Sequence, residues 1–135
     1  MIYMLDTNII IYLLKGYHKQ IAERIRLLED KDKLVMSFVT YAELLYGAKK
    51  SSQPSVNLTR IEELKSIIQV AYNVNFSLCD YYAEWFFKLK KQGILIGNND
   101  LWIASHALSE KAVLVTNNTR EFERITTLTI DNWTT

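Results

Sequence analysis

The stretch Ile2-Tyr3-Met4-Leu5-Asp6-Thr7-Asn8 joins a short apolar run to a cluster of polar residues. The four apolar residues predict a buried strand, and the polar residues predict the start of a helix that runs from about Thr7 to Leu14. Gly16 follows at a position where a glycine can end a helix. The pattern therefore indicates a strand–helix unit with a carboxylate at its junction.

The same alternation of short apolar runs and helical patterns continues along the chain. Further strands are predicted at Leu34–Met36, Val70–Phe76, Ala112–Val115 and Leu128–Ile130. Apolar residues at helical spacing predict helices at His18–Glu29, at Phe38–Lys50, from Pro54 to about Ile68, from about Tyr82 to Gly93 and at Leu101–Leu108. A helical turn is predicted at Arg120–Arg124, and a polar loop at Gly97–Asp100. This alternation predicts an α/β fold whose parallel sheet is covered on both faces.

Length and composition are those of one ordinary globular domain. The 135 residues are expected to form a single domain, residues 1–135, with 49% apolar and 23% charged residues. The single cysteine, Cys79, excludes an internal disulfide framework and suits a cytoplasmic protein. No apolar run approaches the ~20 residues that span a bilayer, and the acidic start does not resemble a signal peptide, so no membrane partner is expected. A net charge of +1 neither favours nor excludes a nucleic-acid partner.

Three acidic residues lie at or near the starts of predicted helices, and each has a simple local role open to it. Asp6 suits the cap of the helix that it precedes. Glu43 follows Thr40 by three residues, as in a capping box, yet it borders an apolar helix face, which is unusual for an acid without a partner. Asp100 opens a helix, where a negative charge complements the helix dipole. Taken singly, these residues leave structural and functional roles open.

Taken together, the three acids are expected at one edge of the sheet, because parallel strands end there. Two carboxylates about 4 Å apart repel by about 4 kcal/mol at an effective dielectric constant near 20, so such a cluster requires protonation or a cation. Oxygen ligands favour Mg²⁺ or Mn²⁺ over zinc, and His18 and His106 are expected to be structural. Carboxylates with a divalent cation indicate phosphoryl chemistry in which water attacks.

Five short motifs, spread over the whole chain, together resemble the pattern of a known family. They are Leu5-Asp6-Thr7-Asn8, Thr40-x-x-Glu43-Leu44 with Gly47, Ile96-Gly97-x-x-Asp100-x-x-Ile103-Ala104, Leu114-Val115-Thr116-Asn117-Asn118 with Glu121-Phe122, and Asp131-Asn132-Trp133. In this order they resemble the PIN domain and, more narrowly, the VapC-type toxins of bacterial VapBC toxin–antitoxin pairs. The resemblance implies a three-layer α/β/α sandwich with about five parallel strands, and an endoribonuclease that requires Mg²⁺ or Mn²⁺.

The resemblance also implies roles for individual residues. Asp6, Glu43 and Asp100 match the acids that bind metal and act in catalysis. Four polar residues match positions beside those acids that support them or contact phosphate: Thr7, Asn8, Thr116 and Asn117.

A fourth acid is where this chain departs from the commonest family pattern. Many relatives carry an aspartate where this chain has Asn117 and Asn118. We expect Glu121, about one turn further on, to supply the fourth carboxylate while Phe122 packs inward. Two alternatives stay open: an exposed pair between Glu121 and Arg124, and a neutral amide of Asn117 in place of the acid.

The resemblance extends to substrate and partners. Residues 116–124 are similar to the branch that cuts initiator tRNA in the anticodon loop. Expected partners are a cognate VapB-type antitoxin and a second copy of the chain or a larger toxin–antitoxin assembly. Residues that could contact them, or hold RNA phosphates, are Tyr41, Tyr46, Trp85 and Phe86, and Lys49, Lys50, Lys88, Lys90 and Lys91.

Two non-catalytic functions compete with this interpretation. A receiver-like switch domain would need an acid beside Asp6 and a lysine after the last strand, and neither is present. A PIN fold that binds RNA without cutting it would be expected to lack some of the acids, and the first three are present.

Overall fold

The computed structural model describes residues 1–135. Its strands are β1 (Ile2–Leu5), β2 (Lys33–Ser37), β3 (Gln69–Ala71), β4 (Val113–Val115) and β5 (Ile130–Asp131). Its helices are α1 (Thr7–Lys15), α2 (Lys19–Arg26), α3 (Phe38–Lys49), α4 (Pro54–Leu64), α5 (Phe76–Gln92), α6 (Asn98–Ser109) and α7 (Thr119–Phe122). None of these helices has the length and apolar character needed to cross a membrane.

The five strands form one sheet in the order β3-β2-β1-β4-β5, and every neighbouring pair is parallel. β1 lies at the centre, with Met4 opposite Val35 of β2 and opposite Leu114 of β4. The chain adds strands first on one side of β1 and then on the other. The sheet therefore has a switch point between β1 and β4, beyond whose carboxyl ends ligands bind in open α/β sheets.

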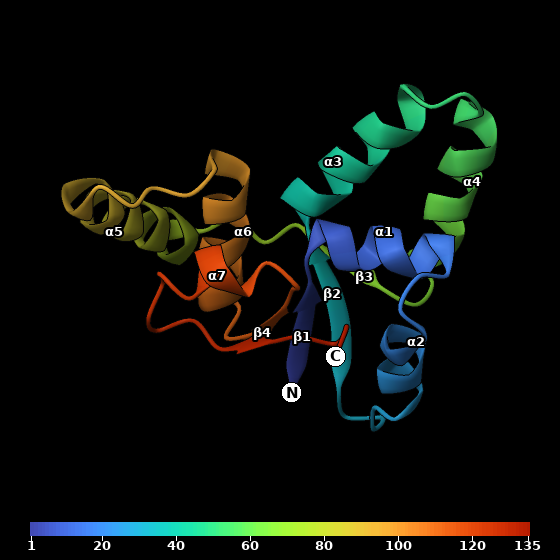
Figure 1. Ribbon diagram of the computed structural model, residues 1–135, viewed down its shortest axis with the longest axis horizontal. Coiled ribbons are helices and arrows are strands. Elements are labelled where there is room, and N and C mark those ends of the chain that lie inside the picture. Colours follow the sequence, from blue (N-terminus) through green and yellow to red (C-terminus); the bar gives the residue numbers. More distant parts are fainter.

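Helices cover both faces of the sheet (Figure 1). Successive residues of a strand point to opposite faces, so Met4 packs in a core with α5, α6 and α7, whereas Leu5 packs in a second core with α1 to α4. Each core contains 13 buried hydrophobic residues. This arrangement confirms the predicted three-layer sandwich with a five-stranded parallel sheet.

Several predicted boundaries were wrong near helix caps. The strand expected at Val70–Phe76 is only Gln69–Ala71, because the side chain of Asn75 accepts a 3.0 Å hydrogen bond from the Leu78 N–H and begins α5 at Phe76. The expected polar loop at Gly97–Asp100 is instead mostly helical, since α6 begins at Asn98. Asp100 thus lies in the first turn of α6.

Other elements also differ at their ends. The last strand is Ile130–Asp131 rather than Leu128–Ile130. The helix from Pro54 ends at Leu64, so Ile68 is buried in the approach to β3 instead of on a helix. The helix expected at His18–Glu29 is shorter, because His18 has a positive φ of 53° and lies outside it.

Candidate active site

Asp6 lies where β1 ends, beside the switch point of the sheet, and both of its carboxylate oxygens are held. Oδ1 accepts a 2.8 Å hydrogen bond from the N–H of Thr7, which makes Asp6 the N-cap of α1, as its local role predicted. Oδ2 accepts a 2.8 Å hydrogen bond from the hydroxyl of Thr116, at the end of β4. Only 4% of Asp6 is exposed, and this burial raises the pKa of its carboxyl although both hydrogen bonds lower it.

Glu43 reaches the same region from the second turn of α3. The side chain of Ser37 caps α3 by accepting from the N–H of Val39, so Thr40 and Glu43 both lie inside the helix and the capping-box interpretation was wrong. The hydroxyl of Thr7 lies 2.6 Å from Oε1 of Glu43 and 3.1 Å from the hydroxyl of Thr40. Since a hydroxyl has one proton, Thr7 donates it to the carboxylate and accepts from Thr40.

Asp100 is brought to these acids by the first turn of α6. The pKa of its carboxyl is raised to about 6, most of all by burial and then by the negative charges of Asp6, Glu121 and Glu43, in that order. Asp100 therefore lies close enough to the other three carboxylates for their charges to act on it, and Glu43 acts on Asp6 in the same way. None of them forms an ion pair with a basic side chain of the protein.

Glu121 lies on the short helix α7, directly before the fully buried Phe122. The amide of Asn118 donates a 3.3 Å hydrogen bond to Oε2 of Glu121. Arg124 does not pair with Glu121; its guanidinium donates to the backbone carbonyls of Ile94 and Leu95 at 3.3 and 3.2 Å. The alternative of an exposed Glu121–Arg124 pair is therefore not realised, and Glu121 faces the acid cluster instead.

The remaining polar residues of the prediction take different positions. Asn8 is exposed in the first turn of α1. Asn117 turns its amide to the hydroxyl of Tyr12, at 3.1 Å, and makes no recorded contact with an acid.

Sequence reasoning missed the asparagines that do touch acids. These are Asn118, described above, and Asn99, whose Nδ2 lies 3.5 Å from Oε2 of Glu43. The Thr116-x-Asn118 spacing held a usable signal, because the N–H of Asn118 donates back to the hydroxyl of Thr116 at 3.0 Å in a common turn.

The donor set fits a hard divalent cation. All of its side-chain donors are oxygens, and Asp6 and Asp100 have a raised pKa because burial, and after it the neighbouring negative charges, disfavour their ionised form. No three acidic, histidine or cysteine side chains converge closely enough to coordinate one ion by themselves. That geometry suits Mg²⁺, which is commonly held by one or two carboxylates and completes its octahedron with water and substrate oxygens.

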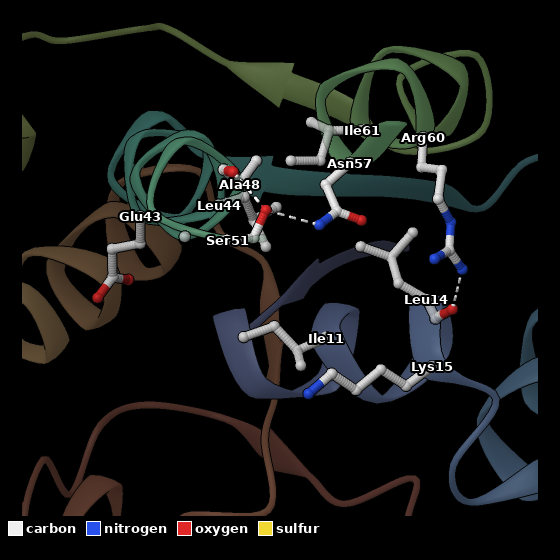
Figure 2. A pocket seen from close by; sticks show the side chains of 11 residues that line it. Ile11, Leu14, Lys15, Glu43, Leu44, Ala48, Ser51, Asn57, Arg60 and Ile61 are labelled. Atoms are coloured by element: carbon white, nitrogen blue, oxygen red, sulfur yellow. Dashed lines mark hydrogen bonds between the residues drawn. The ribbon is translucent and has the colours of Figure 1, made fainter. Parts of the chain in front are cut away.

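A groove of about 290 Å³ runs from this region between α1, α3 and α4 (Figure 2). Glu43 lies at one end of it and Arg60 at the other, and the side chain of Lys15 runs back from the Arg60 end toward the middle. Its apolar lining comes from Ile11, Leu14, Leu44, Ala48 and Ile61. The groove thus combines an apolar floor with two basic side chains, and it reaches the acid cluster at Glu43.

A parallel α/β sandwich with acids gathered at its switch point is the architecture of the PIN-domain nucleases. The family model described as "PIN domain" matches residues 3–128 of the chain. The chain belongs to the PIN-domain family and, within it, to the VapC ribonucleases.

Three relatives carry this assignment. Ribonuclease VapC1 of Haemophilus influenzae (strain R2866) is 55% identical over 134 residues, which cover 99% of each chain. The tRNA(fMet)-specific endonuclease VapC of Shigella flexneri is 40% identical over 131 residues, covering 97% of each chain. The solved structure of VapBC-1 from nontypeable Haemophilus influenzae superposes with a TM-score of 0.94 at 55% identity and covers all of both chains.

Proposed function

We propose that this ribonuclease is the toxin of a VapBC-type pair, requires Mg²⁺ or Mn²⁺, and cuts initiator tRNA in the anticodon stem-loop. The observation that carries the metal requirement is the acid cluster itself. Asp6, Glu43, Asp100 and Glu121 repel one another, and no basic side chain offsets their charge. Because the cluster is half-buried, a cation that binds there reduces the repulsion between the carboxylates and stabilises the folded protein.

Asp6, Glu43 and Asp100 are the proposed metal-binding residues, with at most two of them bonded directly to one ion and the rest holding it through water, and Glu121 is the proposed fourth catalytic acid. When bound, a divalent cation would lower the pKa of a water molecule and offset charge on the phosphate that is attacked. The chain itself supplies the orientation of the acids. Thr116 holds Oδ2 of Asp6, and Thr7 holds Oε1 of Glu43, so both carboxylates are aimed before any substrate arrives.

The tRNA target rests on relatives rather than on geometry. VapC proteins of Shigella flexneri and Salmonella typhimurium, at 40% and 37% identity, are named tRNA(fMet)-specific endonucleases. Residues 116–124, which include Glu121, are also similar to that branch. We extend the specificity of those relatives to this chain, and with it a place in the cytoplasm, where translation occurs.

The antitoxin partner is proposed from the groove and from the neighbouring structures. Solved relatives above 30% identity are VapBC complexes, two of them bound to DNA. In this chain, the apolar floor of the groove and the basic ends of Lys15 and Arg60 suit an antitoxin segment that carries apolar and acidic side chains. Such a segment would cover Glu43 and so inhibit the enzyme.

A second copy of the chain is the other proposed partner. Of the four aromatic residues that could contact a partner, Tyr46 is 65% exposed, whereas Trp85 is buried and belongs to the core. Tyr41 and Phe86 are half-buried. Further exposed apolar side chains cluster just before and at the start of α5: Tyr72, Val74 and Phe76. These surfaces are available for a homodimer.

The test uses purified, antitoxin-free protein and initiator tRNA, with elongator tRNAs as competitors. We expect one cut in the anticodon stem-loop with Mg²⁺ or Mn²⁺, no cut after chelation, and loss of cutting in Asp100→Asn. Binding of the tRNA without any cut, under all metal conditions, would instead favour a non-catalytic RNA-binding role. Cuts spread over other RNAs with initiator tRNA intact would remove the proposed specificity.

A further inference from the structure

His106 is the one buried side chain whose polar atom lacks a hydrogen-bond partner. It is fully buried on α6, and its Nε2 has no such partner, although Oε1 of Glu110 lies 3.5 Å away. An orphaned buried donor is costly, and a leucine or phenylalanine would fill the same space without that cost. The reason for a histidine at this position is therefore to be sought in the contact that its other ring nitrogen makes.

That nitrogen, Nδ1, lies 2.8 Å from the hydroxyl of Ser37, which is also fully buried. Burial lowers the pKa of His106, which favours the neutral imidazole, although Glu110 and the backbone of Asn73 act in the opposite direction. The Ser37 oxygen already accepts the N–H of Val39 as the cap of α3. Its proton is therefore free for Nδ1, and this hydrogen bond joins the start of α3 to the middle of α6 across the core.

The position of this bond matters because the same two helices carry two of the acids. Glu43 follows Ser37 by six residues, and His106 follows Asp100 by six residues. At 1.5 Å per residue each interval is about 9 Å along a helix. The second hydrogen bond between the helices, from Asn99 to Glu43, lies at the acid end, while Phe38 of α3 packs on the His106 ring with the ring centres 5.5 Å apart. The helices thus run antiparallel and are braced at two points, about 9 Å apart along α3 and about 10 Å apart along α6.

We infer that His106 is a positioning residue, whose hydrogen bond to Ser37 fixes α6 against α3 and so sets the gap between Asp100 and Glu43. The inference rests on the proposed function, in which both acids hold a divalent cation. If the brace is removed, the two helices can slide, and a displacement of about 1 Å in a catalytic site typically costs about 100-fold in rate. RNA binding elsewhere on the surface is unaffected.

The test compares two amides that imitate different halves of the imidazole. In His106→Asn the side-chain oxygen can replace Nδ1 and accept from Ser37, whereas in His106→Gln the amide replaces Nε2 and misses Ser37. We expect His106→Gln to lose at least 10-fold in kcat, with the KM for RNA within threefold of wild type. Its affinity for Mn²⁺, measured from the electron-spin signal of the free ion, should fall at least 10-fold. His106→Asn should stay within threefold of wild type in all three quantities.

Ser37→Ala provides the second arm and removes the same bond from the other side. Ser37→Ala also removes the cap of α3, so its own loss should be the larger, but adding His106→Gln to it should cause little further loss, because the shared bond is already gone. Equal losses in the Asn and Gln variants, or losses that simply follow their thermal stability, would overturn the inference, as would wild-type behaviour of His106→Gln. If the wild-type protein cuts no RNA, the proposed function fails, while Mn²⁺ affinity and the amide exchange of α6 still decide whether the brace exists.

Discussion

The hydroxyl of Thr116 donates a 2.8 Å hydrogen bond to Oδ2 of Asp6 and joins the ends of the neighbouring strands β4 and β1. Both residues are buried, with Asp6 4% and Thr116 0% exposed. The same hydroxyl accepts the N–H of Asn118, whose amide holds Glu121. One threonine therefore links the first acid of the site to the loop that carries the fourth.

Replacement of Thr116 by valine should damage the site more than its small change in shape suggests. Thr116→Val leaves the buried Asp6 oxygen without a donor, which costs about 1–3 kcal/mol. We expect lower thermal stability and at least a 10-fold lower rate of RNA cleavage. Thr116→Ser keeps the hydroxyl and is the matched control, with a rate within about threefold of wild type. Equal rates in the valine and serine variants would show that the hydroxyl of Thr116 does not orient Asp6 for cleavage.

Glu121→Gln tests whether the fourth carboxylate is functional. The variant keeps the shape of the side chain but removes its negative charge from the neighbourhood of Asp100. We expect the cleavage rate to fall at least 10-fold, about 1.4 kcal/mol of transition-state stabilisation, with thermal stability nearly unchanged. Glu123→Gln, at an exposed neighbouring position, serves as the control. A wild-type rate would mean that Asp6, Glu43 and Asp100 suffice.

The ionisation of Asp100 should make the metal-free protein less stable at pH 7.5 than at pH 5. The pKa of Asp100 is raised in the folded state, from 3.8 to about 6, so the folded protein binds the proton more tightly than the unfolded chain. Its stabilising contribution is complete below about pH 4 and is lost as the pH rises through about 6.

Asp100→Asn removes this loss and should stabilise the metal-free protein at pH 7.5. The full shift would correspond to about 3 kcal/mol, but Asp100 is only half-buried, so we expect about 1 kcal/mol. Thermal unfolding in EDTA measures it, with the exposed Asp80→Asn as control. Saturating Mg²⁺ should raise the unfolding temperature of the wild type but not of Asp100→Asn. A variant that is less stable than wild type in EDTA at pH 7.5 contradicts the electrostatic part of the account.

Two lysines at the end of α5 should contribute to RNA binding but not to chemistry. The ammonium groups of Lys90 and Lys91 lie 5.9 Å from the ring centres of Phe86 and Phe87, and neither has an acidic partner within ion-pair distance. In the double variant Lys90→Gln/Lys91→Gln we expect a several-fold higher KM and an unchanged kcat. The slope of log affinity against log salt concentration should become less steep, by the amount that corresponds to the loss of about one to two phosphate contacts.

The control for these lysines lies at the opposite edge of the sheet. Lys31 and Lys33 precede or begin β2, at the amino ends of the strands and away from the acids. The double variant Lys31→Gln/Lys33→Gln changes the net charge equally and should leave KM unchanged. Equal effects of the two double variants would show that only the overall charge matters.

Apolar periodicity was sufficient to predict the sheet and the edge at which the acids lie. Met4 and Leu5 alternate between two cores, and Asp6 follows them directly, so a local pattern already located the first carboxylate. Errors arose where a side chain far along the chain, or a cap, decides the structure. Asn75 begins α5 by capping it, and no hydrophobic pattern records that bond.

The polar contacts of the site were less predictable. Thr7 and Glu43 are separated by 36 residues, and their 2.6 Å contact depends on how α1 and α3 pack. The bond from Ser37 to His106 spans 69 residues in the same way. The sequence predicted a structural role for His106, but it gave no indication that the histidine touches the cap of α3.

The most direct test of the account is cleavage of initiator tRNA by the antitoxin-free wild-type protein, measured with Mn²⁺ or Mg²⁺ and again in excess EDTA, beside Asp6→Asn. The new 5′ ends are mapped in a background of total RNA. The account predicts one dominant cut in the anticodon stem-loop that requires the metal and disappears in EDTA and in Asp6→Asn. Undiminished cleavage in EDTA, or wild-type cleavage by Asp6→Asn, would contradict it.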